Sequence, residues 1–267
     1  MKQALRDKLK LRKKKLIVFD IDGTLTPSKA PADKKMIQLM LRLLDEKPVA
    51  IIGGGKYSLF KKQLIEQLPN QDERLKRLYL FPTNSTAFYR FINSWHEVYS
   101  HELSEREKDK IKNAFDETFR KVNYHHPEKT YGPIIEDRNT QITFSALGQE
   151  VVAMCGTKMG VQLKEDWNKK YDKLRQRMRE ILQKLLPEFE VRAGGLTSID
   201  VTRKGIDKSY GVRQIAKHLG VKIEDMLFVG DAIFPGGNDY AALQTGIDYV
   251  KVKDPADTKE LIGTLTN

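Results

Sequence analysis

Residues 16–26 read LIVFDIDGTLT, an apolar run followed by two closely spaced acids. The stretch opens with a continuous apolar run, Leu16–Phe19, which predicts a strand buried on both faces of a parallel sheet. Asp20 and Asp22 follow that run directly, and Gly23 after them permits a tight turn. Functional side chains gather at the carboxyl ends of the strands in parallel α/β sheets. We therefore expect a site at this turn.

Two carboxylates one residue apart suit phosphoryl transfer. One of them can attack phosphorus and form an aspartyl phosphate. The other can give a proton to the leaving oxygen and take one from the next nucleophile. A lone Asp-x-Asp would fit a solvated turn equally well, but the seven-residue run Asp20–Thr26 directly after a buried strand is far more specific. The run therefore favours a catalytic role.

Strand and helix patterns alternate over both ends of the chain. Further buried strands are expected at residues 49–52, 78–81, 226–229 and 249–252, and amphipathic helices at 33–46, about 59–68 and about 210–219. This alternation predicts an α/β fold with a doubly wound parallel sheet.

The middle of the chain follows a different pattern. Ser104 and Glu107 form a capping box that opens a helix, residues 141–146 alternate as a half-buried strand, and a long helix is expected over about 166–186. Strands near 191 and 197–201 complete an antiparallel α+β block. We expect a cap domain at 86–202 inserted into a core domain at 15–85 and 203–267, behind a basic arm at 1–14.

Two further segments carry candidate site residues. Residues 230–240 read GDAIFPGGNDY after a predicted buried strand, and Asp231 and Asp239 there could hold Mg²⁺ opposite Asp20. Taken alone, Asp231 would be a helix N-cap and Asp239 an acid in the first helical turn. Lys208 opens a predicted helix and could neutralise a phosphate, although most lysines are simply solvated.

These three segments, in this order, resemble the haloacid dehalogenase superfamily of phosphotransferases. Residues 49–54 (VAIIGG), 194–200 (GGLTSID) and 234–240 (FPGGNDY) narrow the resemblance to the eukaryotic-type phosphomannomutases. The resemblance implies a Rossmann-like core with an inserted α/β cap, dependence on Mg²⁺, a sugar-phosphate substrate and dimers joined through the cap.

The resemblance also assigns roles by position. Asp20 matches the nucleophile and Asp22 the general acid and base. The metal site is matched by Asp20, the backbone carbonyl of Asp22 and Asp231, and our own analysis of residues 230–240 adds Asp239. The phosphate-binding lysine is matched by Lys208, and the cap residues that hold the sugar phosphate by Arg138, Ser198 and Asp200.

The chain departs from the family pattern at two phosphate-binding positions. Gln149 stands where the family has an arginine, and Gly55 where it has a serine. The backbone amides of Gly53, Gly54 and Gly55 could still hold a phosphate. Losing one charge-assisted hydrogen bond costs about 1.5–3 kcal/mol. Two functions therefore stay open: a phosphomannomutase-like exchange of hexose 1- and 6-phosphates, and a sugar-phosphate phosphatase.

Composition excludes several other classes. The 267-residue chain has a single cysteine, Cys155, which rules out a disulfide scaffold. Its apolar runs fall far below the roughly 18 residues that a membrane span needs, and no apolar stretch follows the N-terminus. We therefore expect a cytoplasmic protein that does not enter a membrane.

Charge is concentrated at the N-terminus. Residues 1–15 contribute +7 of the net charge of +11. Such an arm could grip nucleic acid, but no aromatic residues interleave with its charges. The acidic motifs would also repel nucleic-acid phosphates. We therefore expect a solvated tail and no nucleic-acid partner.

Overall fold

The computed structural model describes residues 10–266, which divide into two compact units. The first unit contains the described residues up to Ser100 together with those from Asp207 onward, and the second contains His101–Ile206. Because the chain leaves the first unit and returns to it, the second unit is an insertion, as the change of pattern in the middle of the sequence indicates.

The first unit is built on a seven-stranded sheet with the order β11-β10-β1-β2-β3-β4-β5. The five strands from β11 to β3 run parallel, and the β4–β5 hairpin is antiparallel. The strands are β1 (Leu16–Asp20), β2 (Val49–Ile52), β3 (Leu78–Phe81), β4 (Ala87–Phe91), β5 (Trp95–Ser100), β10 (Met226–Gly230) and β11 (Asp248–Lys251). This mixed, mainly parallel α/β sheet confirms the predicted fold class.

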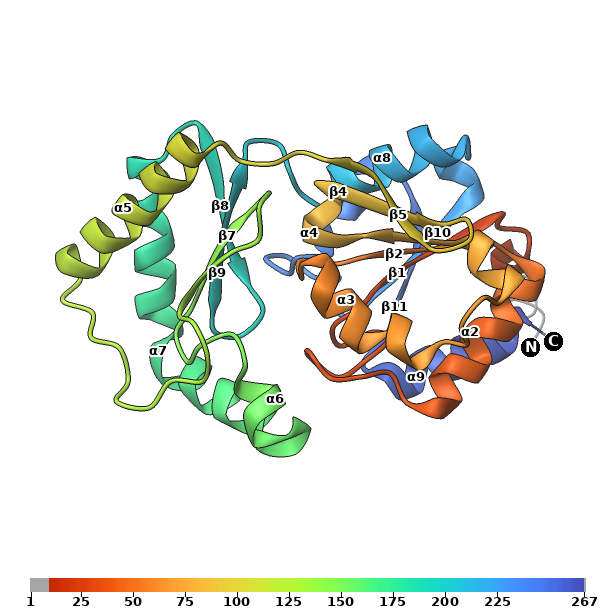
Figure 1. The fold of residues 1–267 in the computed structure, drawn as a ribbon, viewed down its shortest axis with the longest axis horizontal. Coiled ribbons are helices and arrows are strands. Elements are labelled where there is room, and N and C mark those ends of the chain that lie inside the picture. Colours follow the sequence, from red (N-terminus) through yellow and green to blue (C-terminus); the bar gives the residue numbers. More distant parts are fainter. Residues whose placement is uncertain (1–9, 267) are drawn as a thin grey trace. The chain divides into compact units, whose positions relative to one another are not determined.

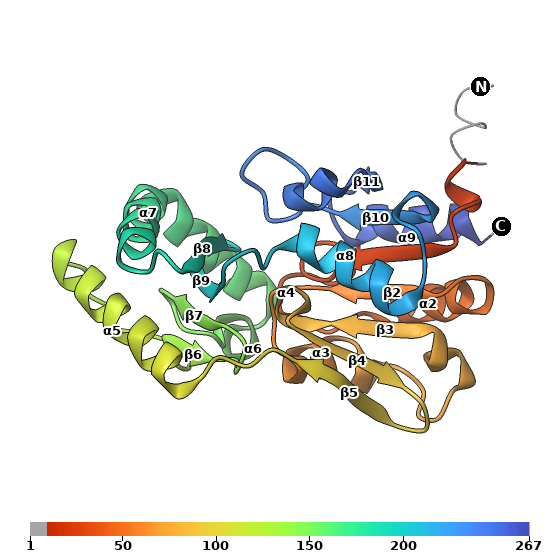
Figure 2. The same cartoon turned by 90° about the horizontal axis from the view of Figure 1, so that it is seen from above.

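Helices cover both faces of this sheet, as Figures 1 and 2 show. Side chains of alternate strand residues pack on α2 and α9 on one face and on α8 on the other. Both clusters are nearly free of solvent contact, which accounts for the unbroken apolar runs of the central strands. The helices are α2 (Lys34–Glu46), α3 (Tyr57–Gln63), α4 (Pro82–Ser85), α8 (Lys208–Leu219) and α9 (Pro255–Leu265).

β1, the middle one of the five parallel strands, contains the apolar run and Asp20. It pairs in parallel with β10 on one side, where Phe19 lies opposite Val229, and with β2 on the other, where Asp20 lies opposite Ile52. Asp20 is therefore the last residue of the central strand, at the carboxyl edge of the sheet. The loops after β1, β2 and β10 leave from this same edge.

The second unit has a four-stranded antiparallel sheet with the order β6-β7-β9-β8. Its apolar face, which includes Phe144, Ile199 and Val201, packs with residues of α5 and α7 in one core cluster, and Figure 1 shows both helices on that side. The elements are α5 (Glu105–Lys121), β6 (Ile135–Asp137), β7 (Ile142–Ser145), α6 (Val151–Cys155), α7 (Thr157–Leu185), β8 (Phe189–Gly194) and β9 (Ser198–Arg203).

The predicted domain boundaries at 85/86 and 202/203 are wrong. Residues 87–100 form the β4–β5 hairpin, which extends the sheet of the first unit through the pairing of Leu80 with Tyr89. The ring of Phe88 stacks on Phe81 with centroids 4.4 Å apart. Residues 203–206, in turn, belong to the second unit. The long helix also begins earlier than expected, at Thr157.

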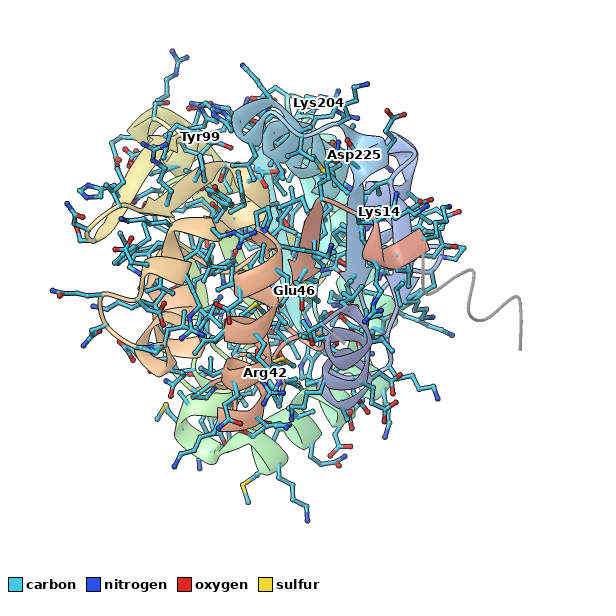
Figure 3. The ribbon with its side chains drawn as sticks, turned by 90° about the vertical axis from the view of Figure 1, so that its right-hand side faces the viewer. Lys14, Arg42, Glu46, Tyr99, Lys204 and Asp225 are labelled. Atoms are coloured by element: carbon cyan, nitrogen blue, oxygen red, sulfur yellow. The ribbon has the colours of Figure 1, made fainter. Side chains whose placement is uncertain are left out.

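The described end of the basic arm contacts the first unit, contrary to the expectation of a solvated tail. Residues 1–9 of the arm lie outside the described range, but Lys14 is 7% exposed and forms an ion pair with Asp248 of β11 at 2.6 Å. Lys10 reaches the same carboxylate at 3.0 Å. Figure 3 shows Lys14 beside the strands at this end of the sheet. The end of the arm is therefore docked on the first unit.

No helix within residues 10–266 combines the length and the apolar character that crossing a membrane requires.

The capping box of α5 predicts a pH dependence of stability. Hydrogen bonds from Arg203 and from the amide of Ser104 lower the pKa of Glu107 from 4.5 to about 2. A carboxylate with a lowered pKa stabilises the folded state above its unfolded pKa and loses that contribution as the pH falls toward its folded pKa. The stability difference between the wild type and Glu107→Gln should therefore shrink between pH 5 and pH 2. Urea unfolding at several pH values measures it, with exposed Glu128→Gln as control, and a constant difference would contradict the prediction.

Candidate active site

A buried ion cluster lies at the carboxyl edge of the first unit's sheet. The Nζ of Lys208, the first residue of α8, donates to Oδ1 of Asp20 and to Oδ1 of Asp239. These three side chains are 3% exposed or less. The cap of α8 is formed by Asp207, which accepts from the amide of Tyr210, so the helix begins where Lys208 can reach the end of β1.

Asp231 completes the cluster at the end of β10. Its Oδ1 accepts a hydrogen bond of 3.0 Å from the hydroxyl of Thr24 in the loop after β1. Oδ2 of Asp239 accepts from the amide of Ala232 at 2.9 Å, which ties the acidic segment back to the strand end. Two segments far apart in sequence thus face each other, as predicted for Asp20, Asp231 and Asp239.

Two glycines make this approach feasible. Gly23 has φ +84°, and a Cβ there would lie 2.7 Å from Oδ2 of Asp231. A Cβ on Gly230 would lie 2.3 Å from Oδ2 of Asp239. Side chains at either position would push the carboxylates apart, so both glycines are needed for the geometry of the cluster.

The cluster carries an excess of negative charge. Burial raises the pKa of Asp20 well above its usual range, and the neighbouring Asp239 and Asp231 add to the effect of burial, while Lys208 opposes it. Burial also raises the pKa of Asp231, with Asp239 as the next cause. Burial lowers the pKa of Lys208, but the charges of Asp20 and Asp239 outweigh burial and raise that pKa overall. The cluster thus contains one ammonium and three carboxylates. Its excess of carboxylates favours the binding of a further cation.

The donor set fits Mg²⁺. Carboxylate oxygens of Asp20, Asp231 and Asp239 lie within 4.8 Å of one another. Mg²⁺ prefers oxygen ligands in octahedral geometry and usually keeps several waters. The residues that the sequence predicted as metal ligands through their side chains are therefore brought together.

Asp22 points to a different set of partners. Its Oδ1 accepts from the amide of Lys29 at 2.6 Å and from Nε2 of Gln63 at 2.9 Å. Gln63 is the last residue of α3 and is 1% exposed. The sequence alone does not single out this glutamine, because its position on the helix face predicts only burial.

The loop after β2 contains the predicted phosphate-binding amides. The amide of Gly53 donates to the carbonyl of Phe81 at 3.3 Å, so binding a phosphate would require it to exchange that partner. The phosphate-binding roles of Gly53, Gly54 and Gly55 stay predictions. A Cβ on Gly55 would lie 2.8 Å from Cδ2 of Leu59, so a serine here would require Leu59 to move.

A strained segment supports that loop. Three successive residues after β3 have left-handed backbones, with φ of 47° at Thr83, 53° at Asn84 and 68° at Ser85. The amides of Thr83 and Asn84 donate to the carbonyls of Gly55 and Gly53, both at 2.9 Å. Left-handed non-glycine residues each cost about 1–3 kcal/mol and cluster at functional sites. Here the segment fixes the carbonyls of the loop after β2.

In the second unit, Arg138 is already partnered. Its Nε lies 2.8 Å from Oε2 of Glu136, its second terminal nitrogen donates to Oε1 of Gln149 at 3.0 Å, and its side chain is 6% exposed. Gln149, where the resemblance implies an arginine, therefore binds Arg138. A cation at residue 149 would instead repel Arg138.

Asp200 and Ser198 lie on the face of the second sheet opposite its apolar core. Cross-strand pairing aligns Glu136 with Thr143, Thr143 with Asp200, and Asp200 with Arg192. The hydroxyl of Thr143 donates to Oδ1 of Asp200 at 2.8 Å. This polar row places the predicted Asp200 beside Thr143 and Arg192, two candidates that the alternating strand pattern alone did not single out.

Comparisons with known proteins identify related chains and a similar fold. The family model described as "Eukaryotic phosphomannomutase" matches residues 36–267. A phosphomannomutase of Spinacia oleracea is 28% identical over 231 residues, covering 84% of each chain. That of Saccharomyces cerevisiae is 28% identical over 270 residues, covering 94% of each. The IMP-nucleotidase of Plasmodium falciparum has a similar fold, with a TM-score of 0.70 and 16% identity, over 98% of this chain and 70% of that one.

Proposed function

This enzyme belongs to the eukaryotic phosphomannomutase family, and from this premise we propose that it transfers the phosphoryl group of a sugar phosphate through an aspartyl phosphate on Asp20. The buried cluster of Asp20, Asp231, Asp239 and Lys208 is the observation that carries the proposal. In this cluster the carboxylate of Asp20 lies beside the ammonium of Lys208. Both lie at the carboxyl edge of the sheet, where active sites form in parallel α/β folds.

The residues of the cluster and of the loop after β1 have separate roles in the proposed reaction. Asp20 forms the bond to phosphorus as the bond to the sugar oxygen breaks, and Asp22 supplies the proton to that oxygen. Lys208 holds Asp20 in place and offers positive charge to the phosphoryl oxygens. Thr24 orients Asp231 through its hydroxyl.

Asp20, Asp231 and Asp239 would hold Mg²⁺, together with the backbone carbonyl of Asp22. A bound Mg²⁺ would offset the repulsion between the attacking carboxylate and the anionic phosphate.

Metal binding should appear in the stability of the protein. Saturation at 100 times the dissociation constant stabilises a folded state by about 2.7 kcal/mol, so we expect Mg²⁺ to raise the melting temperature of the wild type. Asp231→Asn should remove most of this shift. Because the variant also relieves repulsion among buried carboxylates, it should melt above the wild type when both are free of metal. Thermal melts with EDTA and with Mg²⁺ test both signs, and an unchanged Mg²⁺ shift in the variant would refute the assignment of Asp231.

Mutase activity is the first form of the proposal, because the family match extends over residues 36–267. The phosphoryl group would then return to a second hydroxyl of the sugar, so hexose 1- and 6-phosphates would interconvert. This requires the second unit to hold a phosphate remote from Asp20, and we assign that task to Arg138, with Ser198 and Asp200 binding the sugar.

A phosphatase is the second candidate, and a specific observation favours it. The charge of Arg138 is matched by Glu136, and Gln149 adds no further cation. Arg138, with its charge matched in this way, attracts a remote phosphate less strongly than two arginines would. Water would then take the phosphoryl group from Asp20.

One assay separates the two. The protein is incubated with Mg²⁺ and mannose 1-phosphate, with and without a catalytic amount of glucose 1,6-bisphosphate, and mannose 6-phosphate and free phosphate are both followed. Isomer formation that depends on the bisphosphate supports the mutase. Phosphate release without isomer formation supports the phosphatase, and the absence of both products would contradict the choice of substrate.

A further inference from the structure

We propose that Gln63 is a positioning residue for proton transfer: its side-chain amide holds Oδ1 of Asp22, so that Oδ2 is the oxygen that carries the proton. The inference rests on the proposed function and deepens it by naming the group that orients the general acid and base. Its basis is a set of contacts at the end of α3 that the ion cluster of Asp20 and Lys208 does not include.

The contacts of Gln63 are specific. Nε2 lies 2.9 Å from Oδ1 of Asp22 and 3.0 Å from Oγ1 of Thr26. The side chain is 1% exposed, and Thr26 is fully buried. Burying an amide requires hydrogen bonds in compensation, and here both hydrogen bonds of Nε2 end on the catalytic loop.

A second donor reaches the same oxygen of Asp22. The amide of Lys29 donates to Oδ1 at 2.6 Å, and Lys29 has a left-handed backbone with φ 58°. A non-glycine residue in this conformation persists only where its surroundings hold it there. Two donors from separate segments thus converge on one carboxylate oxygen, which leaves the proton to the other.

The amide also has an unused acceptor. Oε1 of Gln63 is buried and makes no hydrogen bond. Such atoms are few in folded proteins and call for an explanation. The amide contacts Asp22 and Thr26 only through its donor and leaves its acceptor unpaired, as expected if holding Oδ1 of Asp22 is the role of the side chain.

The reaction defines what the positioning must achieve. In the first half, a bond forms between Asp20 and phosphorus, the bond from phosphorus to the sugar oxygen breaks, and that oxygen takes the proton of Asp22. In the second half, the oxygen of water or of a sugar hydroxyl bonds to phosphorus, the bond to Asp20 breaks, and Asp22 takes the hydroxyl proton. Both halves need Oδ2 of Asp22 to point at the reacting oxygen, first to donate a proton and then to accept one.

Substrates with different leaving groups isolate this role. A sugar oxygen must be protonated as it leaves, whereas p-nitrophenolate leaves without a proton. Gln63→Met keeps the length of the side chain and removes the donor. In single-turnover experiments with Mg²⁺, we expect this variant to cleave mannose 1-phosphate about 10–100-fold more slowly than the wild type, because lost orientation forfeits only part of the roughly 10²–10⁴-fold that general acid catalysis contributes. The first p-nitrophenol released from p-nitrophenyl phosphate should stay within about twofold of the wild-type rate, because that step makes no use of the acid.

The time course of p-nitrophenol release over several turnovers gives a second measurement. Since the second half-reaction needs Asp22 as a base, Gln63→Met should release one p-nitrophenol per enzyme rapidly and then turn over slowly. Gln67→Met is the matched control, because Gln67 is exposed and its side-chain amide donates to the carbonyl of Lys62, away from the catalytic loop. It should match the wild type with both substrates.

The outcomes are distinct. Equal slowing of both substrates by Gln63→Met would show a structural role and overturn the inference, as would unchanged rates with both. If Gln63→Met fails to fold, Gln63→Glu keeps the size and replaces the donor with a like charge, and the same difference between substrates is expected. Failure of wild-type protein to carry phosphate on Asp20 with either substrate would overturn the proposed function, and this inference with it.

Discussion

Asp20→Asn is expected to lower the rate of phosphoryl transfer by at least about 10⁴-fold, the scale seen when a catalytic nucleophile or its partner is removed. The amide cannot form the aspartyl phosphate, and neither Asp22 nor Asp231 can replace it. Asp22 is held by Lys29 and Gln63, and Asp231 by Thr24. The loss should appear in the rate of chemistry, with the folded structure kept.

The same substitution tests the electrostatics of the cluster. Since burial raises the pKa of Asp20, removing its charge should not destabilise the protein free of metal. Circular dichroism and thermal melts measure the fold and its stability, and phosphate turnover measures the rate of phosphoryl transfer. Asp45→Asn, an exposed aspartate in α2, is the control and should leave both unchanged. Turnover by Asp20→Asn above about a tenth of the wild-type rate would remove Asp20 from the nucleophile's role.

Lys208→Met is expected to cost about 3–5 kcal/mol of unfolding free energy, the range for removing one partner of a buried ion pair. The lysine is 1% exposed and bridges Asp20 and Asp239. Without it, buried carboxylates face one another with no positive charge between them. Activity should fall as well, because the nucleophile loses the group that holds it.

Urea unfolding at neutral pH measures the effect on stability. Lys217→Met on the exposed side of the same helix is the matched control and should change stability by less than about 0.5 kcal/mol. Mg²⁺ should recover part of the stability lost by Lys208→Met, because it brings positive charge back to the carboxylates. A loss below about 1 kcal/mol in the absence of metal would mean that the cluster does not depend on this cation.

The core of the site was predictable from sequence because local patterns and topology coincide there. Asp20 and Asp231 each follow an unbroken apolar run, and such runs become neighbouring parallel strands whose ends meet at one edge. Lys208 follows a helix cap, which places it at the start of α8. No long-range information was needed beyond the pairing of the central strands.

The remaining features depend on contacts that no local pattern encodes. Gln63 lies on a helix 41 residues from Asp22, so its role appears only once α3 is packed. Arg138 contacts Gln149, which lies 11 residues further along the chain, so this hydrogen bond appears only once the second unit is folded. The β4–β5 hairpin was missed because its strand β5 is largely exposed and lacks a clear apolar alternation.

The insertion of the second unit sets the order in which the protein can assemble during synthesis. Leu16 pairs with Met226, so β1 lacks one neighbour until the ribosome has added more than 200 further residues, about the sequence spacing of this pair. At about 5–20 residues per second this delay is roughly 10–40 seconds. Residues 101–206 are continuous in sequence and can complete their own contacts in the meantime. The nascent chain therefore exposes the apolar edge of β1 for that interval, when binding by a chaperone would protect it from pairing with other chains.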